Sequence, residues 1–184
     1  MPSPVRTSLA AAALLLGTGS AVYAKGNPMV GGAAMYPTKT IVENAVNSKD
    51  HTTLVAAVQA AGLVPTLSGP GPFTVFAPTN AAFAKLPAGT VDTLVRPENK
   101  ATLTNILTYH VVSGAMTSKD IAKAIRAGHG TARLTTVQGE PLTASMAGSR
   151  LVLRDAKGGT SMVTIKDVMQ SNGVIHVVDT VLMP

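Results

Sequence analysis

The hydrophobic period of this chain changes once, near residue 131, and that change most constrains its fold. Before it, apolar residues recur at helical spacing, as where Leu54, Val58 and Ala61 follow one another at i, i+4 and i+7. After it, short β-rich runs are separated by glycine-containing turns. Helices followed by an antiparallel sheet predict the α+β class.

Local signals predict where several of these elements begin and end. Gly62 stands where a helix that follows residue 51 needs a C-terminal residue with positive φ. Thr79 or Asn80 is expected to cap the helix that begins near residue 80, after a short strand at 72–78. Thr117 and Asp120 have the spacing of a capping box. In the second half, Asn172-Gly173 predicts a tight type I′ turn between the last two strands.

The N-terminal 24 residues have the features of an export signal. Arg6 is followed by the short apolar run LAAAALLLG, and small residues stand at Val22 and Ala24. The run is too short to span a bilayer, although a retained N-terminal anchor is the alternative. We therefore expect an exported protein, periplasmic or extracellular, with no transmembrane segment in its mature chain. Residues 25–37 are expected to form a flexible Gly/Pro-rich leader, and residues 38–184 a single domain.

The absence of cysteine and tryptophan excludes several classes of site. Without cysteine the chain has no disulfide, thiol nucleophile or thiolate metal site, so folding depends on the apolar core. Aromatic residues make up only 3% of the chain, which argues against base-stacking nucleic-acid modules and aromatic sugar platforms. Nucleic acid is therefore not an expected partner.

The basic surplus is concentrated between residues 119 and 166. The whole chain has a formal charge of +6, and this stretch holds eight basic residues against three acidic ones, which is +5. Such a region can bind anionic polysaccharide or the headgroups of envelope lipids, or it can be an ordinary solvated surface. The candidate basic face consists of Lys119, Lys123, Arg126, Arg133, Arg150 and Arg154.

No local motif indicates catalysis. The four histidines lack the spacing of a metal site, and the chain has no nucleophile elbow, S-x-x-K motif or phosphate-binding loop. His176 and Asp179 point to opposite faces of a regular strand, so we expect them to be structural. We predict a non-enzymatic protein without a cofactor. A hydrolase or metalloprotein site assembled from distant residues, such as His110 and His176 with acids, is the alternative.

Three ordered motifs resemble those of the fasciclin domain family. They are GPFTVFAPTNAAFAKLP at 71–87, LTYHVV at 107–112 and SNGVIHVVDTVLMP at 171–184. The resemblance covers residues 38–184 and implies a wedge-shaped β-sandwich flanked by helices, with the first and last motifs as neighbouring central strands. It gives His176 and Asp179 structural roles, and the turn signal above gives a structural role to Asn172 and Gly173.

The resemblance also implies a function and two candidate interaction sites. Fasciclin domains serve as extracellular adhesion or matrix-binding modules, and bacterial single-domain members are associated with surface adhesion and with host or symbiotic contact. Two family sites fall on Tyr109-His110 and on Asp167-Val168, where this chain has Val instead of Ile. Helical spacing also places His110 on a buried stripe, so that a core role is the alternative. The expected partner is a protein or glycan surface; the alternative is peripheral envelope contact, to polysaccharide or lipid, through the basic region.

Overall fold

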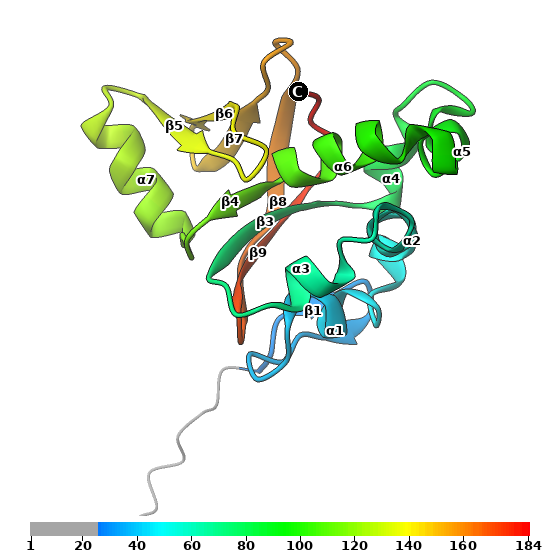
Figure 1. Cartoon of the computed structure of the whole chain (residues 1–184). Coiled ribbons are helices and arrows are strands. Elements are labelled where there is room, and N and C mark those ends of the chain that lie inside the picture. Colours follow the sequence, from blue (N-terminus) through cyan, green and yellow to red (C-terminus); the bar gives the residue numbers. More distant parts are fainter. Residues whose placement is uncertain (1–25) are drawn as a thin grey trace, which may run out of the picture.

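The computed structural model describes residues 26–184, and most of its helices precede most of its sheet (Figure 1). The predicted export signal therefore lies outside the described residues. The helices are α1 (Ile41–Ala45), α2 (Thr52–Ala61), α3 (Val64–Ser68), α4 (Asn80–Ala84), α5 (Thr90–Leu94), α6 (Lys100–Tyr109) and α7 (Ser118–Ala127), with 3-10 turns η1 (Lys49–His51) and η2 (Pro97–Asn99). Across residues 26–184, no helix combines the length and the apolarity that crossing a bilayer requires.

Seven strands form one sheet, and two strands of two residues each form a small hairpin as a second sheet. The strands are β1 (Met29–Val30), β2 (Ala33–Ala34), β3 (Phe73–Pro78), β4 (Val111–Ser113), β5 (Thr131–Thr135), β6 (Pro141–Ala147), β7 (Arg150–Arg154), β8 (Thr160–Gln170) and β9 (Gly173–Val178). The large sheet has the order β4-β3-β9-β8-β7-β6-β5, with β3 parallel to β9 and the other neighbours antiparallel. The predicted α+β class is confirmed.

Strand β8 bends the sheet into two halves. Its first residues pair with β7, whereas Val163 to Gln170 pair with β9 through two register shifts. Such irregularities bend a strand and increase its twist. An antiparallel bridge between Val112 and Thr136 brings the outer strands β4 and β5 together. The two halves therefore enclose a core between them, as in a sandwich.

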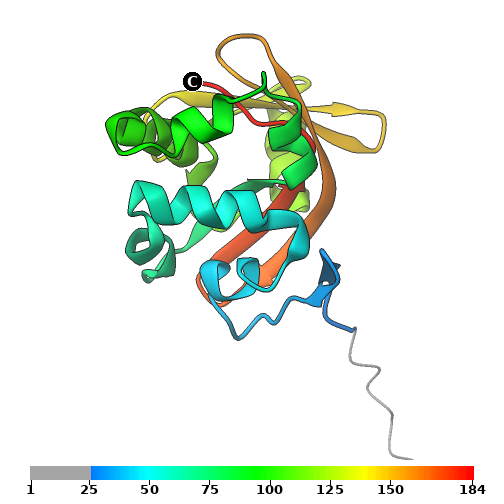
Figure 2. The same ribbon diagram turned by 90° about the vertical axis from the view of Figure 1, so that its right-hand side faces the viewer.

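The central strands β3 and β9 are buried on both faces. On one face, Val75, Ala77, Ile175 and Val177 pack with apolar residues of α1, α2, α3, α4 and α6. On the other, Phe76 and Val178 pack with residues of β5, β6 and β7 and of α7. Figure 2 shows the helices of the N-terminal half, in cyan to green, gathered on one side of β8 and β9. The two end motifs therefore form the neighbouring central pair that the resemblance implies.

The predicted helix-end signals are found in the structure. Gly62 ends α2 with a φ of +71°. Thr79 caps α4 by accepting a hydrogen bond from a backbone N–H of the first turn, and Asn80 instead binds residues of η1 and α2. Thr117 and Asp120 form both hydrogen bonds of a capping box. These signals depend on a few consecutive residues, so the sequence displays them directly.

The leader predicted at residues 25–37 is wrong in its central part. β1 and β2 form a hairpin, and Val30 and Met35 are only 4% and 2% exposed. The Met35 N–H donates to the Pro28 carbonyl at 2.9 Å, so the hairpin is closed behind its turn. Strands of two residues are too short to show a hydrophobic period, which is why the sequence did not reveal them. The packed region therefore begins before residue 38.

The turn between β8 and β9 also differs from the prediction. Gln170 pairs with Gly173, so Ser171 and Asn172 are the two loop residues. Neither Asn172 nor Gly173 has a positive φ, and a type I′ turn is therefore absent there. A Cβ on Gly173 would lie 2.0 Å from the Phe73 carbonyl oxygen of β3. Glycine serves here for close approach between strands and not for turn geometry.

The side chain of Asn172 joins three distant segments. Its Oδ1 accepts from the Ile41 N–H at 3.0 Å, and its Nδ2 donates to the carbonyls of Leu67 at 2.7 Å and Gly69 at 3.0 Å. These bonds join the β8–β9 turn to the start of α1 and to the end of α3. A buried amide with its polar atoms satisfied fixes the position of all three segments.

Candidate functional site

An open groove of about 530 Å³ lies between α7, the turn that joins β6 to β7, and the first part of β8. Four basic side chains line it: Lys119 and Arg126 from α7, Arg150 from β7 and Lys166 from β8. No acidic residue or histidine is among its lining residues. We name this feature the basic groove.

The amphipathic pattern of α7 places two of its three basic residues along the groove. Ile121 and Ile125 are 0% and 3% exposed and hold the helix against the sheet. Lys119, Ala122 and Arg126 share the neighbouring stripe and form one wall. The basic groove therefore exists because the helix docks through its isoleucines and leaves this stripe open to solvent.

Asp167 fixes the start of α7 to the bend in β8. It has a φ of +60°, in the left-handed region that few residues other than glycine adopt. Its carboxylate accepts from the Ser118 N–H at 2.5 Å and from the Ser118 hydroxyl. Its own N–H donates to His176 Nδ1 at 3.3 Å. The strained residue thus positions one end of the groove, and its carboxylate is already bound.

The two interaction pairs carried over from the resemblance do not form a surface. Tyr109 and Val168 are 0% exposed, His110 is 2% exposed and Asp167 is half-buried. The Tyr109 hydroxyl donates to the Pro141 carbonyl at 3.3 Å and accepts from the Ala156 N–H. Tyr109, His110 and Val168 therefore lie in the core, as the alternative from helical spacing expects for His110, and Asp167 is half-buried at the bend of β8.

His110 is part of the buried hydrogen-bonding network. Its Nε2 accepts from the Leu182 N–H at 3.0 Å, so its Nδ1 carries the proton and donates to the Ile106 carbonyl at 2.8 Å. Burial lowers the pKa of His110 to about 4, against the opposing effect of the Ile106 hydrogen bond. The neutral ring therefore links the end of α6 to the last residues of the chain.

His176 and Asp179 bind different partners. His176 is 0% exposed, its Nε2 donates to the Met116 carbonyl at 2.8 Å, and its ring stacks on Phe76 with centroids 5.6 Å apart. Asp179 accepts from the Met162 N–H at 2.8 Å and lies 3.8 Å from the Lys85 ammonium group. The geometry gives both residues structural contacts. Among residues 26–184, no group of three His, Cys, Asp or Glu side chains is arranged to hold a metal ion.

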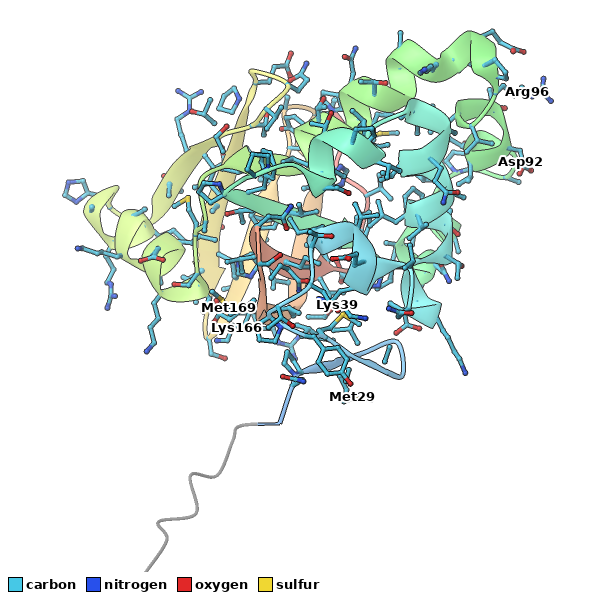
Figure 3. The ribbon with its side chains drawn as sticks, turned by 60° about the horizontal axis from the view of Figure 1, so that its bottom comes forward. Met29, Lys39, Asp92, Arg96, Lys166 and Met169 are labelled. Atoms are coloured by element: carbon cyan, nitrogen blue, oxygen red, sulfur yellow. The ribbon has the colours of Figure 1, made fainter. Side chains whose placement is uncertain are left out.

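The structure divides the basic face predicted from the sequence. Lys119, Arg126 and Arg150 line the groove, while Lys123, Arg133 and Arg154 are exposed outside it. Lys166 completes the groove although the sequence did not place it on that face. Figure 3 labels Lys166 next to Met169, both on β8. Only the pairing of β7 with β8 and the docking of α7 bring these cations together.

Acidification is expected to destabilise the fold through its buried histidines. Between about pH 6.5 and 4, His110 takes up a proton in the unfolded chain but not in the folded one, so stability falls as the pH falls. Burial also lowers the pKa values of His51 and His176, which adds to the effect in the same direction. We expect His110 alone to remove about 2 to 3 kcal/mol of unfolding free energy between pH 7 and pH 4.5.

Urea unfolding at these two pH values checks this expectation. His110→Gln lowers the stability at pH 7 but is expected to show a smaller loss on acidification than the original chain. His129→Gln, which alters an exposed histidine, is the matched control and should keep the original pH dependence. Equal losses in all three proteins would show that His110 does not cause the acid sensitivity.

Comparison with known proteins assigns the fold to one family. The fasciclin domain model matches residues 49–184. Protein sll1483 of Synechocystis is 46% identical over 158 residues, which cover 85% of this chain and 79% of that protein. The cell surface glycolipoprotein MPB83 of Mycobacterium bovis is 38% identical over 193 residues, covering 99% and 79%. The resemblance inferred from the three motifs is confirmed.

A solved structure shows the same fold. The FAS1 domain pair of the insect cell adhesion molecule Fasciclin I matches with a TM-score of 0.69 and 20% sequence identity. The match covers 79% of this chain and 51% of that one, so the chain spans about half of the two-domain structure.

Proposed function

Because the chain belongs to the fasciclin domain family, we propose that it is an exported, non-enzymatic adhesion or interaction domain that binds a partner at a cell surface, matrix or host contact. Two similar proteins support this function by their descriptions, one as a cell surface glycolipoprotein and one as a cell adhesion molecule. The export signal at residues 1–24 belongs to the same proposal. The partner would meet the domain outside the cytoplasm.

The basic groove is the surface that we expect to bind this partner. It is lined by four cations, and its lining holds no histidine or carboxylate. The exposed basic side chains produce a positive potential, which concentrates anionic partners and increases their association rate. The groove therefore supports recognition of a negatively charged surface.

Retention on washed cells of the producing organism, and on their isolated envelope, tests the proposed function. At roughly 0.05 M salt we expect the purified chain to be retained, and at roughly 0.5 M we expect most of it to be released, because the screening length falls about threefold. Retention at both salt concentrations would keep the adhesion function but remove the basic groove as its main contact. Failure to bind any cell or envelope fraction at either concentration would overturn the proposal.

A further inference from the structure

We propose that the basic groove binds an extended anionic polysaccharide, whose carboxylate or sulfate groups pair with the cations of both walls. This inference rests on the proposed function and names the chemistry of its partner. Lys119 and Arg126 contribute charge from the helix, and Arg150 and Lys166 contribute it from the strands. A thin charged chain lying between the walls would therefore be contacted from two sides.

The two acidic residues next in sequence to Lys119 and Lys166 bind groups at the start of α7. Asp167 directs its carboxylate to the N–H and hydroxyl of Ser118. Asp120 binds the N–H and hydroxyl of Thr117 in the capping box. Within residues 26–184 none of the four cations forms an ion pair, and Arg150 donates one hydrogen bond to the Met162 sulfur, so all four keep donors for an external anion. The Arg126 and Arg150 guanidinium groups match the planar geometry of a carboxylate and can bind it with two parallel hydrogen bonds.

The size and lining of the groove favour a glycan over a small anion. A volume of about 530 Å³ lies within the usual range for small-molecule sites, roughly 300 to 1,000 Å³, and far exceeds the needs of one phosphate or sulfate. Ser149 and Thr164 supply hydroxyl groups for sugar hydroxyls. Met146 and Met162 offer apolar surface for the C–H faces of sugar rings. Charge, hydroxyl and apolar groups together suit an acidic sugar chain.

Two other anionic partners fit less well. Proteins that lie on membranes usually insert a wide apolar face with Trp, Phe or Leu beside their basic residues. The groove is recessed and presents only methionines among its large apolar side chains that are partly exposed. Nucleic-acid strands are usually held by aromatic stacking, and no aromatic residue lines the groove. These observations favour a polysaccharide that is recognised by charge.

The test is calorimetric titration of the full purified chain with oligogalacturonate and with sulfated heparin fragments. A neutral dextran fragment of similar length should not bind. The double variant Lys119→Gln/Arg150→Gln is expected to bind the anionic fragments about 30-fold more weakly, because it loses two charge-assisted contacts. Both side chains are exposed, so the variant should keep its melting temperature.

A matched control distinguishes the loss of groove contacts from the loss of net positive charge. Lys123→Gln/Arg154→Gln removes one lysine from α7 and one arginine from β7, four positions further along each element and outside the groove. We expect it to change the affinity by less than about threefold, since screened charges outside the site contribute little. Equal weakening in both variants would overturn the assignment to the groove.

Three further results separate the outcomes. Tighter binding to phosphatidylglycerol vesicles or to polyglutamate than to either oligosaccharide would overturn the inference in favour of a lipid or an acidic protein. No binding of oligosaccharide by a chain that still adheres to cells would overturn the inference and leave the proposed function standing. Failure of the unaltered chain to adhere to cells would contradict the proposed function itself. In favour of the inference, log affinity should fall with log salt with a slope no steeper than about −3, the value for four contacts to a densely charged single strand.

Discussion

A chain that ends at Gly173 is expected not to fold cooperatively. Deleting residues 174–184 removes most of β9 from between β3 and β8 and leaves both neighbours with unpaired backbone groups. Six apolar side chains that are buried in the intact domain are lost: Val174, Ile175, Val177, Val178, Val181 and Leu182. Their burial contributes about 10 kcal/mol, which is comparable to the roughly 5 to 15 kcal/mol that stabilises a whole domain.

The same deletion also affects both apolar cores and the buried histidine network. Ile175 and Val177 belong to the core beneath the helices, and Val178 and Leu182 belong to the core between the sheet halves. His110 loses the Leu182 N–H that its Nε2 accepts from. Buried polar atoms without partners add to the cost of the lost apolar contacts. No part of the sheet can therefore retain its packing.

Circular dichroism and urea unfolding measure this outcome. The truncated chain should show no sigmoidal transition, whereas deletion of only Met183 and Pro184, which are partly exposed, should leave a cooperative one. If the chain without residues 174–184 unfolds in a single sharp transition, β9 is not the central strand on which the two cores depend.

Much of the fold was predictable because its signals are local or ordered along the chain. The cap at Thr79 and the capping box at Thr117 each depend on residues within one helical turn, so the sequence shows both. The single change of period separated the helices from the later strands. The order of the three motifs, through the family resemblance, predicted that β3 and β9 are neighbouring central strands, whereas their parallel direction emerges only from the structure.

Features made by distant residues were not predictable. Asn172 binds Ile41 and Leu67, which lie 131 and 105 positions earlier in the sequence. Its neighbour Gly173 fits a common turn signal, so the local pattern favoured the wrong explanation. The hairpin at residues 29–34 is held by packing and not by its own pattern. Tertiary contacts decide such positions, and a single sequence does not display them.

The candidate site was predictable only in part for the same reason. Lys119 and Arg126 are seven residues apart, which places them on one face of a helix. Arg150 and Lys166 join them only when β7 pairs with β8 and α7 docks on the sheet. The family motif located Tyr109 and Val168 but gave no exposure, and the structure buries both. The concentration of basic residues therefore indicated the region of the site, and only the folded structure shows which of those residues line the groove.

Gly173→Ala is expected to be a strongly destabilising substitution, although it adds only one methyl group. The added Cβ would lie 2.0 Å from the Phe73 oxygen and 2.9 Å from the Phe73 nitrogen, both in the backbone of β3. Backbone atoms in a paired strand cannot rotate away as a side chain can, so β3 and β9 must separate at the start of their pairing. This movement also displaces Asn172 from the groups that its amide binds. We expect a loss of about 3 kcal/mol or more in unfolding free energy.

Gly89 serves as a control that distinguishes the cost of steric crowding from the cost of a left-handed backbone conformation. Gly89 has a φ of +79° and nothing within 4 Å of an added Cβ, so Gly89→Ala should cost only the left-handed conformation, about 1 kcal/mol. Gly173 has no positive φ, and its substitution causes only crowding. Urea unfolding of both variants should therefore rank Gly173→Ala as clearly the less stable. The reverse order would mean that β3 and β9 can move apart easily, which contradicts their place as the fixed centre of both cores.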